Sequence, residues 1–383
     1  MALIGFGEPL PHLALPGTRN PRYMVASVAG RWTLLLFLPR QDALPREATA
    51  AAEAALAAVR RRLDDEDALF FLVVPRAEGL GTRWRDSLPG IRVLADPDGA
   101  ALAACGGDPE AGAAILLDPF HRVLESGPFA AAPQLLARLG TLPPAPEHAG
   151  PDEVPAPVLV LPRVLEPEFC RRLIGLYDAA GGEASGFMRE VDGRTVAASD
   201  PGFKRRSDHL VSDPAVLEML RERIARRLLP AIHQAFQFQA TRIERFLVAC
   251  YDGGTGGFFR AHRDNTTRGT AHRRFAVTVN LNTEEFEGGE LRFPEFGRRT
   301  YRAPTGGAVV FSCSLLHEAL PVTRGRRYAF LPFLYDEAGA RLRDQNLRFV
   351  GAPEPETASP ATAQPAPPEP LPAGPAALPA APA

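Results

Sequence analysis

Three residues in the second half of the chain have the types and spacing of a metal site. His262 and Asp264 are separated by one residue, and a strand places residues i and i+2 on the same face, so both side chains can point at one ion. His317 follows the apolar run 309–316, which we interpret as the end of another strand. Two imidazoles and one carboxylate on one side of an ion leave positions open for a cosubstrate and dioxygen. The spacing therefore predicts a non-haem Fe(II) site.

Two other interpretations of these three residues are open. They could be ordinary strand residues at the polar end of a sheet, or ligands of a structural zinc ion. A closed zinc site needs a fourth protein ligand, and His272 is the candidate nearest in sequence. Because His272 lies in a polar stretch beside Arg273 and Arg274, we predict a solvated surface histidine there.

An arginine that could bind a carboxylate follows ten residues after His317. This residue is Arg327, and a guanidinium in a pocket can pair with a carboxylate through two hydrogen bonds. Alternation along a strand puts Arg327 on the opposite face from Arg326 and Tyr328, so only one of the two arginines can point inward. The spacing favours Arg327, with a surface arginine as the alternative.

In this order the residues resemble the 2-oxoglutarate- and Fe(II)-dependent dioxygenases, and among them the prolyl 4-hydroxylase-like branch. The resemblance covers roughly residues 157–336. It rests on Tyr251 with Gly253-Gly254, Phe259-x-x-His262-x-Asp264, Leu281-Asn282, Gly288-Gly289-Glu290-Leu291, His317 and Gly325-x-Arg327.

The resemblance implies the cofactors and the role of each residue. His262, Asp264 and His317 would hold Fe(2+), and the far carboxylate of the cosubstrate 2-oxoglutarate would pair with Arg327. Tyr251 would be a second cosubstrate contact, although it lies eleven residues before His262, about two more than the family spacing, so a core aromatic residue is the alternative. The implied reaction uses O2, with L-ascorbate as an optional cofactor. It hydroxylates a peptidyl (prolyl-like) or small-molecule substrate and releases succinate and CO2.

The implied fold of residues 158–350 is an α+β double-stranded β-helix, or jelly roll, with buttressing helices. We expect a helix over 167–180, a helix pair over 213–236 and a mobile polar loop over 181–207. The charge run Lys204-Arg205-Arg206 at the end of this loop is either solvated or part of a lid that faces the substrate. Thr278 and Asn280 share a strand face, and either could add a polar contact inside.

Residues 1–142 alternate strand and helix signals, which predicts an α/β domain. This half resembles the peroxiredoxins and thioredoxin-like proteins, which use a thiolate just after the central strand. The corresponding stretch of this chain, residues 40–47, contains no cysteine. We interpret Cys105, which lies elsewhere, as a small core residue. We therefore expect a degenerate thioredoxin-like domain without a peroxidatic cysteine. The matching motifs are Gly7-Glu8-Pro9-Leu10-Pro11, the strand at 35–39, Ala95-Asp96-Pro97-Asp98-Gly99 and Ile115-Leu116-Leu117-Asp118-Pro119.

Composition limits the remaining classes of function. A net charge of −2 gives no electrostatic footprint for nucleic acid. The four cysteines lie far apart in the sequence, which favours a reducing compartment. We see no signal peptide or membrane span, and expect a soluble cytoplasmic chain. We predict that residues 143–157 form a Pro-rich linker and that residues 351–383 form a disordered tail rich in Pro and Ala.

Two alternative functions come from other classes. One is a catalytically inactive binding scaffold, which the intact triad and Arg327 disfavour. The other is a thiol peroxidase with an accessory jelly roll, which the missing cysteine near residue 43 disfavours. The expected partners are a peptide or small-molecule substrate and a protein docking on the N-terminal domain.

Overall fold

The computed structural model describes residues 2–40, 46–78, 80–82, 85–148, 154–191 and 193–351. The chain divides into two compact units. The first comprises Met1–Pro155 with Phe293–Arg299, and the second comprises Ala156–Arg292 with Thr300–Ala383. The boundary falls within the segment that we predicted as a linker, but the inclusion of Phe293–Arg299 in the first unit was not predicted.

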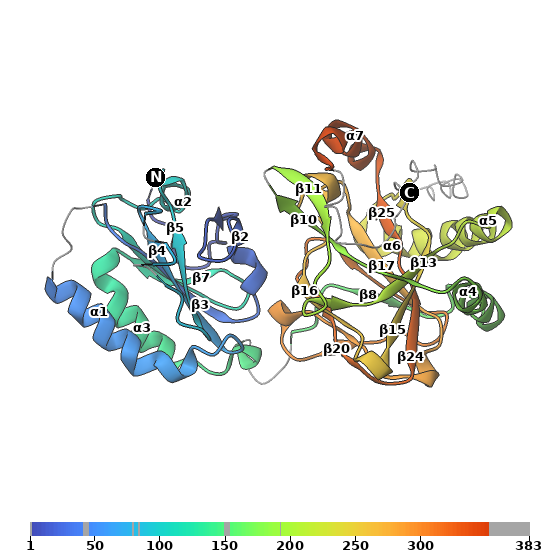
Figure 1. Cartoon of the computed structure of the whole chain (residues 1–383), viewed down its shortest axis with the longest axis horizontal. Coiled ribbons are helices and arrows are strands. Elements are labelled where there is room, and N and C mark those ends of the chain that lie inside the picture. The colour runs from blue at the N-terminus through green and yellow to red at the C-terminus, as the bar shows by residue number, and fades with distance from the viewer. Residues whose placement is uncertain are drawn as a thin grey trace, which may run out of the picture. The chain divides into compact units, whose positions relative to one another are not determined.

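The first unit is built on a five-stranded sheet in the order β5-β4-β3-β6-β7. The central strand is buried along its whole length, as its apolar sequence predicts for a strand covered on both faces. Helices α1 and α3 lie side by side on one face of the sheet (Figure 1). The elements are β1 (Ala14–Leu15), β2 (Tyr23–Met24), β3 (Trp32–Phe37), α1 (Arg46–Val59), β4 (Ala68–Val74), β5 (Ile91–Ala95), α2 (Ala100–Ala104), β6 (Ala113–Leu117), β7 (Val123–Gly127) and α3 (Ala132–Thr141).

Strands β3, β4 and β5 run parallel, and β6 and β7 are antiparallel additions. This is the α/β layer that the alternating signals indicate, whereas the relation to thioredoxin-like proteins stays a prediction. Cys105 follows α2 and is fully buried, in agreement with a core residue. Residues 41–45, within the stretch where a peroxidatic cysteine would stand, lie outside the described residues.

The start of the predicted linker is wrong. The backbone N–H of Ala145 donates to Asp67 at 2.6 Å, and the carbonyl of Pro143 accepts from the indole of Trp32 at 2.8 Å. Ala145 itself is buried in the core of the first unit. The proline-rich composition therefore concealed a segment, residues 142–148, that belongs to the folded unit.

The described part of the second unit contains two large antiparallel sheets and two two-stranded ones, β10-β11 and β18-β23. The larger has the order β14-β25-β17-β24-β15-β13-β9, with β21 bridging β17 and β8, and the smaller has the order β12-β16-β22-β19-β20. The helices are α4 (Pro167–Ala180), α5 (Pro214–Arg223), a π-helical turn (Ile224–Leu228), α6 (Leu229–Phe236) and α7 (Glu337–Asn346). The strands are β8 (Leu159–Leu161), β9 (Glu183–Ala184), β10 (Phe187–Val191), β11 (Arg194–Ala198), β12 (Lys204–Arg205), β13 (Ser207–Leu210), β14 (Arg242–Glu244), β15 (Leu247–Asp252), β16 (Phe258–His262), β17 (Phe275–Asn280), β18 (Glu287–Gly288), β19 (Leu291–Arg292), β20 (Thr300–Tyr301), β21 (Ala308–Ser312), β22 (His317–Ala319), β23 (Val322–Arg324), β24 (Arg326–Phe330) and β25 (Phe333–Tyr335).

Strand β15 shows how the two faces of the larger sheet are used. Its residues Val248 and Cys250 pack in a core with α4, α5 and α6. The alternate residues Ala249 and Tyr251 pack instead with Phe259 of the smaller sheet. One face of the larger sheet is thus covered by helices and the other by the second sheet, which is the layering of a jelly roll with buttressing helices.

Three local predictions for the second unit need correction. Residues 181–207 are not a structureless loop, because they contain β9, the β10–β11 hairpin and β12. The predicted helix pair is one helical run through a π turn. His317 begins β22 and does not end the preceding strand, since β21 stops at Ser312.

Helix α7 was not predicted, and residues 352–383 of the tail lie outside the described residues. No helix in the described ranges is long and apolar enough to cross a bilayer.

Candidate metal centre

The smaller sheet brings the two predicted histidine ligands together. His262 is the last residue of β16 and pairs across the antiparallel ladder with His317, the first residue of β22. The register shifts between Phe259 and His262, as at a β-bulge, which re-aims the strand end. The two imidazole centroids are 4.3 Å apart. Asp264 follows two residues after the end of β16, so it joins them without being in the strand itself.

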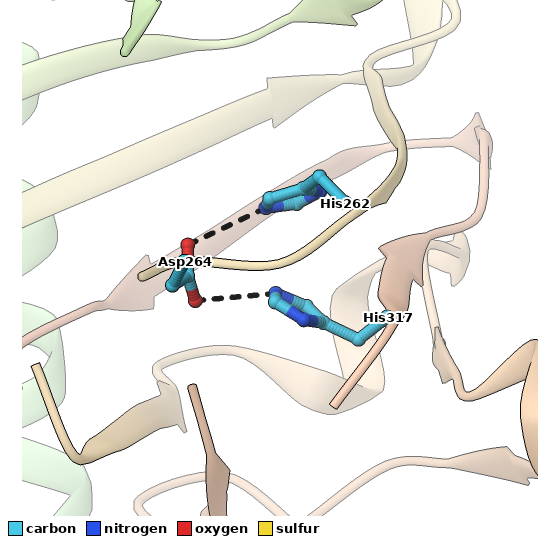
Figure 2. A group of neighbouring side chains, drawn as sticks. All are labelled: His262, Asp264 and His317. Carbon is cyan, nitrogen blue, oxygen red and sulfur yellow. Dashed lines mark ion pairs between the residues drawn. The ribbon is translucent and has the colours of Figure 1, made fainter. Parts of the chain in front are cut away.

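The three side chains point at one another (Figure 2). Nε2 of His262 lies 3.5 Å from Oδ1 of Asp264, and Nε2 of His317 lies 3.3 Å from Oδ2. One potential ligand atom from each residue lies within 4.8 Å of the others. The structure therefore assembles two imidazole nitrogens and a carboxylate at one point, which is the donor set of a facial triad.

The backbone fixes the tautomer of each histidine. Nδ1 of His262 lies 2.7 Å from the carbonyl oxygen of Arg260, and Nδ1 of His317 lies 3.0 Å from that of Leu315. A carbonyl oxygen can only accept, so each Nδ1 carries the proton and each Nε2 presents a lone pair. Both lone pairs face Asp264, as metal-binding imidazoles require.

Burial and neighbouring charges keep His317 and Asp264 in their metal-binding protonation states. Burial, followed by the neighbouring His262, lowers the pKa of His317 to about 4, so its imidazole is neutral at neutral pH. Burial alone would raise the pKa of Asp264, but His317 and His262 outweigh burial and hold that pKa well below its usual range. A neutral His317 imidazole and an ionised Asp264 carboxylate can bind a divalent cation without first losing a proton.

His272 is not a fourth ligand, and it is not the surface residue that we predicted. It is only 2% exposed, and its Nε2 lies 2.8 Å from the carboxylate of Glu244. Among the described residues, the group that could hold a metal ion contains His262, Asp264 and His317 alone. A closed tetrahedral zinc site therefore lacks its fourth protein ligand here.

A buried ion pair that the sequence did not reveal supports the backbone at Asp264. Arg273 donates from Nε to one carboxylate oxygen of Glu244 at 2.9 Å and from Nη2 to the other at 2.5 Å. Its Nη1 donates to the carbonyl oxygen of Asp264 at 3.3 Å. Glu244 and Arg273 are far apart in sequence and belong to no recognisable motif. The pair could therefore not be predicted before the fold was known.

Arg327 is buried inside the second unit with an unused donor. It is 2% exposed, whereas Arg326 is exposed and pairs with Asp252, in the orientation that strand alternation predicts. Its Nε and Nη2 lie 3.4 Å from Oδ1 of Asn280, and its buried Nη1 has no partner among the described residues. Burial lowers the pKa of Arg327. A buried guanidinium with an unused donor is suited to an incoming carboxylate.

Tyr251 lies between two arginines. The guanidinium carbon of Arg327 is 5.0 Å from the centroid of the Tyr251 ring, and that of Arg206 is 5.8 Å away. Nη1 of Arg206 is 3.4 Å from the Tyr251 hydroxyl oxygen. Tyr251 is thus beside the arginine proposed to bind the cosubstrate, and it is also part of the core.

The charge run at 204–206 is only partly solvated. Lys204 is 7% exposed, and its Nζ donates to the carbonyl of Gly186 at 2.6 Å. Arg206 pairs with Asp208 at 2.6 Å, while Arg205 is exposed. Lys204, Arg206 and Asp208 alternate along the chain, so they share one face, which is turned inward.

Comparison with known proteins gives a family match within the second unit and several similar relatives. Residues 246–335 match the family model described as the 2OG-Fe(II) oxygenase superfamily. The PKHD-type hydroxylase PiuC of Pseudomonas aeruginosa PAO1 is 30% identical over 149 residues, which are 36% of this chain and 64% of the relative. A PKHD-type hydroxylase of Cupriavidus metallidurans is 30% identical over 186 residues, 45% of this chain and 75% of the relative. The matched part of this chain thus spans slightly less than two thirds of PiuC.

A crystal structure of a Pseudomonas putida prolyl-4-hydroxylase is also similar, with a TM-score of 0.35 and 21% identity. The match covers 47% of this chain and 94% of that one.

Proposed function

This chain belongs to the 2OG-Fe(II) oxygenase superfamily, and on that premise we propose that it is a 2-oxoglutarate-dependent hydroxylase. Its substrate would be a prolyl-like residue in a peptide, or a small molecule, and the coproducts would be succinate and CO2. The observation that carries the proposal is the convergence of His262, Asp264 and His317 in a unit that also buries Arg327 with an unused donor.

The chain's own residues supply binding and orientation. His262, Asp264 and His317 would hold Fe(2+), which when bound supplies the activation of O2 and the oxidative decarboxylation of 2-oxoglutarate. Arg327 would bind the far carboxylate of 2-oxoglutarate through its free Nη1. Asn280 would hold the opposite edge of the guanidinium, and the Tyr251 ring would support its face.

Aromatic side chains would limit the access of water to the triad. Phe259 stacks on the imidazole of His262 with centroids 3.6 Å apart, and Phe311 lies 4.5 Å from the ring of His317. Phe203 packs edge-on against Phe259 at 5.6 Å. These rings would restrict how each imidazole rotates and keep the surroundings of the site apolar, which favours a single productive geometry.

The proposal also covers the roles of the two domains, an optional cofactor, the cellular location and the partners. We take residues 158–350 as the dioxygenase domain and the first unit as a thioredoxin-like domain on which a protein partner docks. L-ascorbate is an optional cofactor, the location is cytoplasmic, and nucleic acid is not a partner, in keeping with a net charge of −2.

The test is the release of succinate from 2-oxoglutarate by the full chain. The iron-loaded protein is incubated in air with 2-oxoglutarate, alone and with proline peptides and small metabolites. We expect succinate that depends on Fe(2+) and on O2, at a rate that rises with a substrate. The Asp264→Ala variant is the control. Equal succinate from wild type and Asp264→Ala would overturn the proposal.

A further inference from the structure

Arg245, like Arg327, has a buried guanidinium nitrogen without a hydrogen-bond partner among the described residues, and the mechanism above does not use it. It joins β14 to β15, is partly buried, and holds a left-handed backbone with φ of 56°, which is uncommon for a residue other than glycine. Its guanidinium carbon lies 4.4 Å from the centroid of the Phe333 ring. Its Nε is buried without a hydrogen-bond partner in the described part of the chain. An uncommon backbone conformation together with an unsatisfied buried Nε calls for a functional explanation, and binding of an anion would provide one.

The position of Arg245 is close to the proposed metal centre. Arg273 lies over the same Phe333 ring, at 4.0 Å, and donates to the carbonyl oxygen of Asp264 at 3.3 Å. Arg245 is therefore a neighbour of the residues that hold Asp264.

The other inward-facing cations in this region already have partners or assigned ligands. Arg206 pairs with Asp208, and Lys204 donates to Ser185 at 2.7 Å as well as to the backbone. Arg327 would receive the cosubstrate carboxylate. The buried Nε of Arg245 has neither a hydrogen-bond partner among the described residues nor an assigned ligand.

Arg245 also stays charged at neutral pH. Burial, and then the positive charges of Arg273 and Arg206, lowers its pKa to about 10. A guanidinium in this state offers a planar set of N–H donors that matches the oxygens of a carboxylate or phosphate. Stacking on Phe333 orients the group without using these donors.

We propose that Arg245 binds an anionic group, a carboxylate or a phosphate, of the substrate beside the metal centre. This inference rests on the proposed function and narrows it, because it selects acidic substrates over neutral ones. In a peptide substrate the anion would be an acidic or phosphorylated residue near the target, or the C-terminal carboxylate. In a small-molecule substrate it would be the molecule's own acid group.

The test measures the unfolding midpoint of the full chain loaded with Mn2+, which prevents turnover, and with 2-oxoglutarate. The probes are inorganic phosphate, N-acetyl-L-proline, and the neutral N-acetyl-L-prolinamide, each titrated against chloride at equal ionic strength. At about ten times its dissociation constant, a binding anion should raise the midpoint by about 2–4 °C. The amide should give no increment. Stabilisation by phosphate alone would identify a phosphate site, and by N-acetyl-L-proline alone a carboxylate site.

Variants test whether Arg245 causes the rise in the unfolding midpoint that an anion produces. Arg245→Asn should abolish it, and asparagine tolerates the left-handed backbone, so the fold is retained. Arg245→Lys should restore part of it. The matched control is Arg205→Asn, whose side chain is exposed and should not matter. An increment that survives in Arg245→Asn, or wild-type protein that neither anion stabilises more than chloride does, would overturn the inference.

The same experiment separates this inference from the proposed function. Stabilisation by 2-oxoglutarate itself should vanish in Arg327→Ala and persist in Arg245→Asn. If 2-oxoglutarate does not stabilise wild-type protein, the proposed function fails, whichever result the anions give. If 2-oxoglutarate stabilises through Arg327 and the anions do not stabilise, only the anion site is wrong.

Discussion

Tyr251 and Arg327 are cross-strand partners on the antiparallel strands β15 and β24, and the guanidinium carbon lies 5.0 Å from the centroid of the ring. The aromatic ring supports the guanidinium but does not neutralise it. The same pairing places Arg326 opposite Asp252, where the two form an exposed ion pair. Two adjacent arginines therefore have different surroundings because the strand turns them to opposite faces.

The first prediction concerns cosubstrate binding. Arg327→Ala should weaken the binding of 2-oxoglutarate by about 2–5 kcal/mol, because a desolvated carboxylate loses its charge partner. Arg326→Ala is the matched control and should change binding by less than about 1 kcal/mol, as expected for an exposed ion pair. Calorimetric titration of Mn2+-loaded protein would measure both. A larger loss in Arg326→Ala would mean that the register of β24 is shifted by one residue.

The second prediction concerns His272, which is buried against Glu244. His272→Ala should lower the free energy of unfolding by about 1.5–3 kcal/mol, because Glu244 loses a hydrogen bond in a buried network. His233→Ala, at an exposed position, is the control and should be nearly neutral. Denaturant unfolding of the metal-free proteins measures the difference. Equal stability of the two variants would contradict the buried network.

The third prediction is that the stability of the fold depends on pH through Asp208. Burial alone would raise the pKa of this carboxyl, but Arg206 and then Lys204 outweigh burial and lower it. A carboxylate with a depressed folded-state pKa stabilises the fold above its unfolded pKa of about 3.9, and this stabilisation is lost as the pH falls through the folded pKa.

Asp208→Asn should therefore cost on the order of 3–5 kcal/mol at neutral pH, since it leaves Arg206 buried without its charge partner. The difference from wild type should shrink at the lowest pH at which both proteins still unfold cooperatively. Asp252→Asn, in an exposed pair, is the comparison and should cost about 0–1 kcal/mol. A difference for Asp208→Asn that is independent of pH would argue against the lowered pKa.

The fourth prediction concerns the cysteine of the first unit. Cys105 is fully buried, and burial raises the pKa of its thiol to about 12, so almost no thiolate forms at neutral pH. Iodoacetamide should not modify Cys105 in the folded protein, and Cys105→Ser should leave peroxide consumption at background. Peroxide turnover that Cys105→Ser removes would revive the thiol peroxidase alternative.

The sequence was most informative where short-range pattern and chemistry coincide. The helix expected at 167–180 is α4, Pro167–Ala180, because proline begins it and a glycine follows its end. His262 and Asp264 converge as their spacing predicts, although Asp264 lies beyond the strand. Their roles as iron ligands remain predictions.

The sequence was least informative about charged residues that the fold buries. Lys204 and His272 lie in polar stretches that resemble solvated surface, and the partners that permit their burial, such as Glu244, are distant in the chain. Arg245 carried no signal, because its significance depends on a left-handed backbone and on Phe333 of another strand. The 293–299 segment joins the first unit through tertiary packing that no local pattern encodes.

The central claim is that His262, Asp264 and His317 bind iron, and the most direct test is the amount of Fe(II) bound per chain. Anaerobic titration of the full chain with Fe(II), followed by removal of free metal, should leave one iron per wild-type chain. His262→Ala, Asp264→Ala and His317→Ala should each retain almost none, while His272→Ala retains the wild-type amount. Full iron retention by a folded triad variant, or its loss in folded His272→Ala protein, would contradict the account.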